Sequence, residues 1–397
     1  MEPEVKAEKI PDDRSVIVVS DMHLGLKNRE QVSTDFSDFL AFIRLLVPGS
    51  GTAGSPSVMV DGKPKELLAP AKIILLGDII DLWSPRGNNR ASVLADSYPI
   101  IQSLFALPTE IVYIAGNHDN EIAEIEGSFP VSAPGKLTII KRHYPDSPPG
   151  RNGIKQHSGI PIGDHRYFFM HGQQFDLLFN AAGLLQDYPG WVAKNYSLFK
   201  ELPRIKWFFW ALFGFSLLYV LANIILKITT LFDGLVYILL GLSVVIVLFS
   251  IEPTAFRAFW DKISLRKNTK TETIESIIET GFWKTEAGDN ILADIVVFGH
   301  THIADDSKDR YLQMHHKRFI NSGSWGDEKM KTSDGRGVSE KNTFVYIDKE
   351  GPVLFRWPDK GPLPEQIRTT LTGNPAGPIP PASPIKQWMR RNIWTSG

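Results

Sequence analysis

Apolar residues are arranged along the 397-residue chain in two recurring patterns. Short, nearly continuous runs rich in β-branched residues predict strands that are covered on both faces. These runs lie at residues 15–20, 72–76, 110–115, 136–142, 166–170, 293–298, 318–325, 343–347 and 353–355. Apolar residues at helical spacing predict helices over residues 33–47 and 91–106. The combination predicts an α/β fold.

Two longer apolar runs lie between these strands. Residues 207–226 carry no formal charge, and residues 231–251 carry only Asp233. Each run reaches the roughly 20 residues that a helix needs to cross a bilayer. The four residues between them leave room only for a tight helical hairpin. A buried hairpin inside a large core is the alternative, but the runs are apolar on all sides.

The flanks of these runs predict an orientation. Aromatic residues open the first run and follow the second, on the same side, as in the aromatic belt of membrane proteins. Seven basic residues surround that side: Lys200, Arg204, Lys206, Arg257, Lys262, Arg266 and Lys267. By the positive-inside rule we expect a multi-pass protein of the cytoplasmic (inner) membrane, with the rest of the chain in the cytoplasm.

The patterns divide the chain into five parts. We expect a flexible N-terminus at 1–14, the first part of the α/β domain at 15–180, a helical insertion at 181–290, the second part of that domain at 291–357, and a Pro/Gly-rich tail at 358–397. The polar N-terminal residues do not form a secretory signal, which argues against a secreted protein.

Composition excludes some kinds of site. The formal net charge of −1 gives no basic surplus for nucleic acid, so we expect no nucleic-acid partner. The chain has no cysteine, which rules out disulfides and thiolate metal ligands.

Polar side chains follow five of the predicted strands at the point where each strand ends. Ligands of α/β proteins bind just beyond the carboxyl ends of strands, where such ends lie close together. The five clusters are Asp21 with His23, Asp78, Asn117 with His118, His171, and His300 with His302. Imidazole, carboxylate and amide ligands without sulfur favour manganese, iron or zinc. There are enough of them for two ions, about 3.5–4 Å apart, that clamp a phosphoryl group and share a hydroxide.

The clusters resemble, in order, the motif blocks of the calcineurin-like metallophosphoesterase superfamily. The blocks are Asp21-x-His23, Gly77-Asp78-x-x-Asp81, Gly116-Asn117-His118-Asp119, His171-Gly172 and Gly299-His300-Thr301-His302. The resemblance implies a four-layer α/β/β/α sandwich, here with an inserted two-helix transmembrane hairpin. It also implies two divalent ions, with manganese favoured. One ion would be held by Asp21, His23, Asp78 and His302, and the other by Asp78, Asn117, His171 and His300.

The same resemblance gives His118 a catalytic role. This histidine would face the phosphate and protonate the leaving oxygen rather than bind a metal. Asp119 would orient His118 by a hydrogen bond, with a helix N-cap as the alternative role. Asp81 is expected to cap a helix or brace its loop, with a role toward the substrate as the second interpretation. Asn321-Ser322-Gly323-Ser324 is expected to form a structural turn.

Within the superfamily, the chain is most similar to a membrane-associated branch that cleaves UDP-2,3-diacylglucosamine. The similarity lies in residues 77–83 and 171–176 and in a helical insertion before Gly299. The chain departs from that branch at His118, where the branch usually has Arg, and in having a double span instead of a peripheral lid.

We therefore expect hydrolysis of a phosphoester or pyrophosphate bond in a lipid-linked or nucleotide-lipid substrate at the cytoplasmic membrane surface. One alternative is an anchored phosphatase or phosphodiesterase that acts on a soluble nucleotide. A nuclease fits poorly with the low net charge. A non-catalytic membrane binding protein would be expected to have lost a ligand or His118, and neither is lost.

Overall fold

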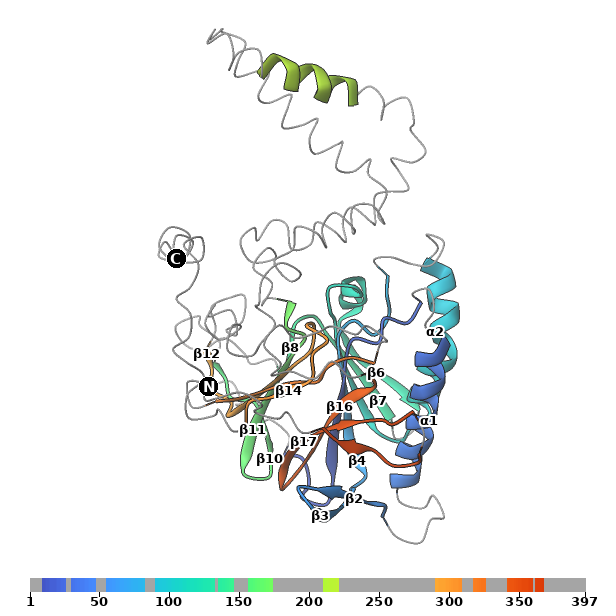
Figure 1. Ribbon diagram of the computed structural model, residues 1–397, viewed down its shortest axis with the longest axis vertical. Coiled ribbons are helices and arrows are strands. Elements are labelled where there is room, and N and C mark those ends of the chain that lie inside the picture. Colours follow the sequence, from blue (N-terminus) through green and yellow to red (C-terminus); the bar gives the residue numbers. More distant parts are fainter. Residues whose placement is uncertain are drawn as a thin grey trace.

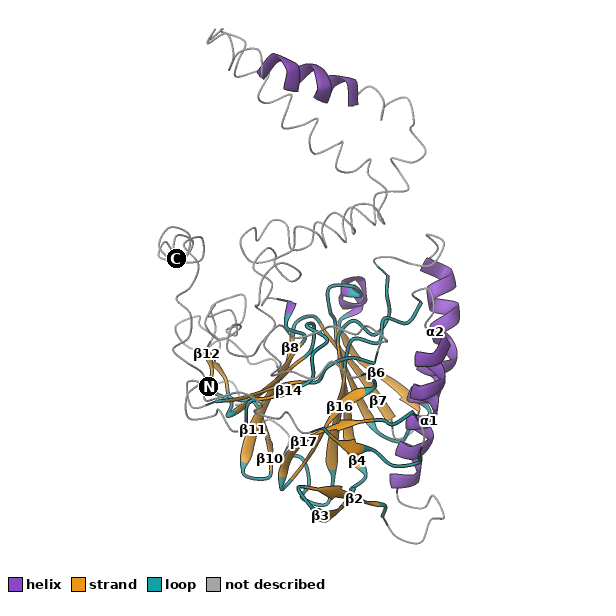
Figure 2. Ribbon diagram, viewed as in Figure 1, coloured by secondary structure: helices purple, strands orange, loops and turns teal. Residues whose placement is uncertain are grey.

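A computed structural model of the chain shows two β-sheets packed face to face, with two long helices on one side (Figures 1 and 2). The structure describes residues 9–25, 30–47, 55–82, 90–132, 135–145, 156–173, 210–220, 290–308, 317–325, 341–359 and 361–367.

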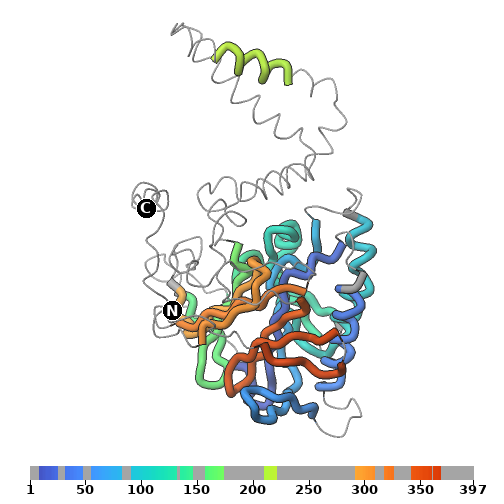
Figure 3. Tube along the Cα trace, in the orientation of Figure 1, coloured from blue at the N-terminus to red at the C-terminus, as the bar shows by residue number. Residues whose placement is uncertain are grey.

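The first sheet has a parallel centre. Its strand order is β18-β17-β16-β1-β4-β5-β7-β6, and the pairs β1–β4, β4–β5 and β5–β7 are parallel. The strands are β1 (Ser15–Val19), β4 (Pro70–Leu76), β5 (Glu110–Ile114), β6 (Gly127–Ser132), β7 (Gly135–Ile140), β16 (Thr343–Asp348), β17 (Gly351–Arg356) and β18 (Glu365–Gln366). Because β16 pairs with β1, strands from the first and last parts of the described residues lie side by side (Figure 3).

The second sheet joins segments from both sides of the predicted insertion. Its order is β10-β11-β13-β15-β14, with β8 also paired to β11, and the neighbours β11, β13 and β15 run parallel. The strands are β8 (His143–Tyr144), β10 (Ile160–Ile162), β11 (His165–Met170), β13 (Ile295–Phe298), β14 (Asp305–Asp306) and β15 (Arg318–Asn321). Two small pairs complete the described strands: β2 (Ser57–Val60) with β3 (Lys63–Glu66), and β9 (Gln156–His157) with β12 (Asn290–Ile291).

Alternate side chains of β1 are buried in two different hydrophobic cores. Both faces of this strand are therefore apolar. Ile17 and Val19 pack in the core that includes the helices α1 (Glu30–Leu46) and α2 (Arg90–Phe105). Val16 and Val18 pack in the core that includes residues of the second sheet. A further buried cluster, with Phe168 and Phe298, lies in the second sheet. The described residues therefore form helix, sheet and sheet layers, and the prediction of a fourth layer falls on residues outside them.

Most of the predicted membrane hairpin lies outside the described residues. Only 210–220 is described, as a helix with Phe215 69% exposed and Leu218 68% exposed (Figure 1). Among the helices that the structure describes, none has the length and apolar character needed to span a bilayer.

The C-terminal boundary differs from the prediction. The tail was expected to begin at residue 358, but β18 pairs with β17 and Ile367 is buried, so the folded domain continues to that residue. Residues 143–162 contain the short strands β8, β9 and β10. The pairing of β9 with β12 joins segments that are distant in the chain, which local patterning does not reveal.

Candidate metal centre

The predicted ligands lie together at the carboxyl ends of the parallel strands. Asp21 follows β1, Asp78 follows β4, Asn117 follows β5, His171 follows β11, and His300 and His302 follow β13. Backbone hydrogen bonds join these loops: Asp21 N donates to Gly77 O at 3.0 Å, and Gly299 N donates to His171 O at 2.9 Å. Residues almost 300 positions apart in the chain thus meet at one edge of the two sheets.

Most of these loops hold their ligands in a strained backbone conformation. Seven non-glycine residues of the described part have positive φ, and five of them are predicted ligands: Asp21, His23, Asp78, His300 and His302. Each such residue costs of order 1–3 kcal/mol, and strain of this kind concentrates at functional sites. The backbone therefore points to the same residues as the motifs, by an independent physical criterion.

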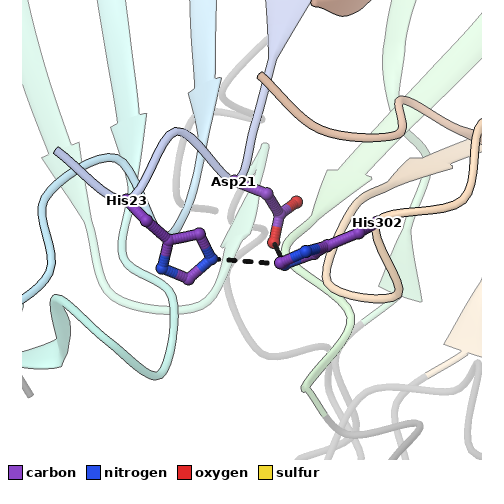
Figure 4. A group of neighbouring side chains, drawn as sticks. All are labelled: Asp21, His23 and His302. Atoms are coloured by element: carbon purple, nitrogen blue, oxygen red, sulfur yellow. Dashed lines mark hydrogen bonds and ion pairs between the residues drawn. The ribbon is translucent and has the colours of Figure 1, made fainter. Parts of the chain in front are cut away.

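Asp21, His23 and His302 form a first buried group (Figure 4). His302 Nε2 lies 3.0 Å from Asp21 Oδ1 and 3.2 Å from His23 Nε2. The side chains come from the loops after β1 and β13, and their nitrogen and oxygen atoms face one another.

Asp78, His171 and His300 form a second buried group beside the first. His171 Nε2 lies 3.3 Å from each of Asp78 Oδ2, His300 Nδ1 and Asn117 Oδ1. Asp78 Oδ2 also lies 3.9 Å from His23 Nε2 of the first group. Asp78 is thus the residue that joins the two groups.

The composition of these groups fits divalent ions. In each, the possible ligand atoms lie within 4.8 Å of one another on buried residues. A cation between the facing imidazole nitrogens and the two buried carboxylates would compensate the negative charge and coordinate the nitrogen lone pairs. A set of nitrogen and oxygen ligands of this kind suits manganese, iron or zinc.

The charges of the cluster shift the pKa values of its carboxylates. Burial alone would raise the pKa of Asp78, but the nearby His171 and His118 hold it well below its ordinary value. For Asp21 burial likewise opposes ionisation, and His302 outweighs it, so that this pKa is also lowered. Both carboxylates are therefore ionised at neutral pH, as metal ligands must be.

The two groups differ in the protonation of their histidines. Burial lowers the pKa of His23 to about 4, so its ring is neutral at pH 7. Burial also disfavours protonated His171, but the Asp78 carboxylate reverses the effect and the pKa rises to about 9. In the metal-free protein, His171 therefore carries a proton that His23 lacks.

His118 lies against the cluster and is held by Asp81. Its Nδ1 is 2.9 Å from Asp81 Oδ2, and its ring meets the ring of His23 edge to face at 4.6 Å between centroids. Asp78, His23 and His118 also form a third group of possible ligands. The hydrogen bond to a carboxylate requires Nδ1 to carry the proton, which leaves Nε2 for other chemistry.

The predicted role of Asp119 in orienting His118 is wrong. Asp119 Oδ2 accepts hydrogen bonds from Tyr113 Oη at 2.6 Å and Ile79 N at 2.8 Å, and Oδ1 accepts one from Gly116 N at 2.6 Å. Asp119 precedes the short helix η2 (Asn120–Ile125), but its side chain makes no capping hydrogen bond there. Its carboxylate is directed into the sheet, and burial, followed by the Asp78 charge, raises its pKa to about 6.

Asp81 has contacts with the site that its position in the sequence did not predict. It was expected to brace a loop, and it does connect the loops, because its N–H donates to Leu24 O at 2.8 Å. Its side chain, however, contacts two site histidines, with Oδ2 3.4 Å from His23 Nδ1 as well as bonded to His118. The three-residue spacing from Asp78 was the available signal.

The turn at residues 321–324 supports the loops at both ends of the chain. Ser324 Oγ donates to Asp21 O at 3.0 Å, and Asn321 Nδ2 donates to Thr301 Oγ1 at 2.6 Å. Gly323 has φ of 77°, and a side chain there would overlap Thr343. The contacts are those of a structural turn that secures Asp21 and the loop carrying His300 and His302.

Comparison with known proteins agrees with this geometry. A family model described as calcineurin-like phosphoesterase matches residues 14–304, a range that contains every residue of the cluster. A search of curated proteins found no match to the chain.

Proposed function

Since the match over residues 14–304 shows that the chain belongs to the calcineurin-like phosphoesterase family and is a metal-dependent phosphoesterase, we propose that it hydrolyses a lipid-linked phosphoester or pyrophosphate at the cytoplasmic surface of a membrane. The observation that carries the reaction class is the pair of buried groups joined by Asp78. Two adjacent cation sites are the arrangement that stabilises both the attacking and the leaving oxygen of phosphorus.

The proposed ligand sets divide the cluster between two ions. Asp21, His23, Asp78 and His302 would hold one, and Asp78, Asn117, His171 and His300 the other. When bound, divalent ions supply charge for the phosphoryl oxygens and activation of water as the nucleophile. Manganese is our proposal among the metals that this donor set accepts.

His118 acts as the general acid in this proposal. Protonated His118 donates the proton on Nε2 to the leaving oxygen as the phosphorus–oxygen bond breaks, and the ring becomes neutral. Asp81 keeps the other proton on Nδ1 throughout, through the 2.9 Å contact, and so fixes which nitrogen faces the substrate. His23, edge to face against His118, limits the rotation of that ring.

The membrane part of the proposal rests on where the apolar runs lie in the chain. Residues 207–226 and 231–251 come between His171 and His300, so both flanks of a hairpin must return to the same metal centre. Two spans satisfy that requirement and one does not. The exposed Phe215 and Leu218 on the helix at 210–220 favour apolar surroundings for this segment.

A substrate presented at the membrane surface would fit an insertion in this position, because the insertion lies in the chain between β11 and β13, whose ends carry predicted ligands. The branch that cleaves UDP-2,3-diacylglucosamine offers one substrate class, a nucleotide-lipid pyrophosphate. His118, in place of the Arg usual in that branch, leaves the exact substrate open. The second candidate is an anchored enzyme for soluble nucleotides, which needs the same metal centre and only the anchor function of the hairpin.

Two measurements separate these candidates. The full-length protein in mixed micelles should release product from a nucleotide-lipid pyrophosphate with kcat/KM at least about tenfold above that for the matching soluble nucleotide. His118→Ala should lose both activities while remaining in the membrane fraction. A preference for the soluble nucleotide would contradict the lipid proposal. Release of the protein from membranes by alkaline carbonate would contradict the spanning hairpin.

A further inference from the structure

Tyr113 places a hydroxyl group among the aliphatic residues at the end of β5. It lies in β5, between Val112 and Ile114, and is 5% exposed. A buried tyrosine hydroxyl needs a hydrogen-bond partner, and this one lies 2.6 Å from Asp119 Oδ2. The bond joins the strand to the loop that follows it, six residues along the chain.

The other hydrogen bonds accepted by Asp119 connect two loops that carry predicted metal ligands. Its Oδ2 also accepts from the N–H of Ile79, the residue directly after Asp78. Its Oδ1 accepts from the N–H of Gly116, the residue directly before Asn117. A single carboxylate, oriented by Tyr113, therefore ties the backbone beside one predicted ligand to the backbone beside another.

The two loops have little freedom to adjust around this contact. His118 N donates to Asp78 Oδ1 at 2.8 Å, and Leu82 N donates to His118 O at 3.0 Å. A side chain at Gly116 would overlap the Asp78 carboxylate, so the loops are already in van der Waals contact. Rotation of the Asp119 carboxylate would be passed directly to the spacing of Asp78 and Asn117.

We propose that Tyr113 is a positioning residue of the metal centre, whose hydroxyl holds Asp119 in the orientation that sets the spacing between Asp78 and Asn117. The proposal rests on the proposed function only in taking these two residues as ligands of a shared ion. Tyr113 does not touch the substrate. Its effect is on the affinity for the ion between Asp78, Asn117, His171 and His300.

Tyr113→Phe removes one oxygen atom and keeps the ring, so it tests the hydroxyl directly. Isothermal titration of the metal-free protein with Mn²⁺ should show about tenfold weaker binding of one ion, the size of effect typical when a residue supporting a ligand is lost. The other ion should be weakened less, because it shares Asp78 with the first but does not depend on Asn117. Asp119→Asn, which replaces a carboxylate that accepts four hydrogen bonds, should weaken the same ion further.

Tyr346→Phe is the matched control. Tyr346 is also a buried tyrosine of the first sheet, and its hydroxyl accepts a hydrogen bond from Leu68 N at 2.8 Å, outside the metal centre. Both Tyr→Phe variants should lower the Tm of the metal-free protein, because each removes a buried hydroxyl together with its hydrogen bonds. Only Tyr113→Phe should change Mn²⁺ affinity.

Equal Mn²⁺ affinities in wild type and Tyr113→Phe would overturn the proposal and leave the proposed function intact. Loss of cooperative unfolding in Tyr113→Phe would overturn it as well, because the hydroxyl would then be essential to the fold. A wild-type protein that binds no divalent ion would overturn the proposed function itself, and with it this proposal.

Discussion

Asp81 Oδ2 lies 2.9 Å from His118 Nδ1 and 3.4 Å from His23 Nδ1, so one carboxylate oxygen contacts two imidazole rings of the site. In the proposed function, one of these rings binds a metal and the other transfers a proton. Asp81 therefore links the metal centre to the acid that acts on the leaving group.

Replacing Asp81 by Asn should slow catalysis more than it changes stability. Asp81→Asn keeps the size of the side chain but loses the carboxylate oxygen that holds Nδ1 of His118 and contacts His23. We expect kcat to fall by about 10–100-fold, the range found when the partner of a site histidine is removed. In the double variant with His118→Ala, the two losses should not add, because both residues act in one step.

A buried aspartate elsewhere provides the control for that measurement. Asp35 accepts a hydrogen bond from Asn342 Nδ2 at 2.7 Å, between α1 and the residue before β16. Asp35→Asn should leave kcat unchanged. If Asp81→Asn also retains wild-type kcat, His118 does not depend on this carboxylate.

Metal affinity should rise with pH because of His171. With its pKa raised to about 9 by Asp78, this residue is protonated in the metal-free protein at pH 7, and a metal ligand must be deprotonated. The apparent affinity of its ion should increase by about tenfold per pH unit up to about pH 9. His23, with a pKa of about 4, is already neutral and adds no such dependence.

Calorimetry in buffers of different ionisation enthalpy measures this proton directly. At pH 7, His171 should release about one proton as the protein fills with Mn²⁺. The same pKa shift should stabilise the metal-free protein fully below pH 6.5, and this contribution should be lost as the pH rises through 9. Metal binding that neither releases protons nor changes with pH would contradict the assignment of His171 as a ligand.

Comparing Ala variants of two glycines with nearly identical φ angles distinguishes the effect of backbone strain from the effect of a steric clash in the site. Gly77 has φ of 82° and Gly62 has φ of 80°. A side chain at Gly77 would overlap the ring of His171, whereas one at Gly62 would meet nothing within 4 Å. Both Ala variants should lose about 1 kcal/mol of stability from backbone strain. Only Gly77→Ala should lose metal binding, by about tenfold or more.

Thermal unfolding and Mn²⁺ titration of the two glycine variants give the comparison. A Gly77→Ala protein that binds Mn²⁺ as tightly as Gly62→Ala would mean that His171 can move without loss, and would argue against its placement in the second group.

The sequence predicted most of the elements that position the site. Strands such as β1 and β5 are short and buried on both faces, so their residues are almost all apolar and their ends are marked by a change to polar residues. Because the cores on either side of β1 take alternate side chains, Ile17 and Val18 serve different layers with the same chemistry. The ends of these strands, and the predicted ligand residues that follow them, could therefore be identified from the sequence.

The sequence could not predict which acidic side chain, that of Asp81 or that of Asp119, contacts His118. Asp81 and Asp119 both lie within reach of the loop that carries His118, and spacing along the chain favours Asp119, its neighbour. The left-handed conformation at Asp78 turns its loop so that Asp81 reaches His118, while Tyr113 draws Asp119 into the sheet. Such choices depend on contacts between strands and loops that are distant in sequence.

The most direct test of the account is a titration of metal-free protein with Mn²⁺ in which bound metal and hydrolysis of a phosphodiester are measured in the same samples. The account predicts negligible activity without metal and a plateau at about two ions per chain. His118→Ala should bind the same number of ions and remain slow. Full activity after complete removal of metal, or a His118→Ala protein as active as the wild type, would contradict it.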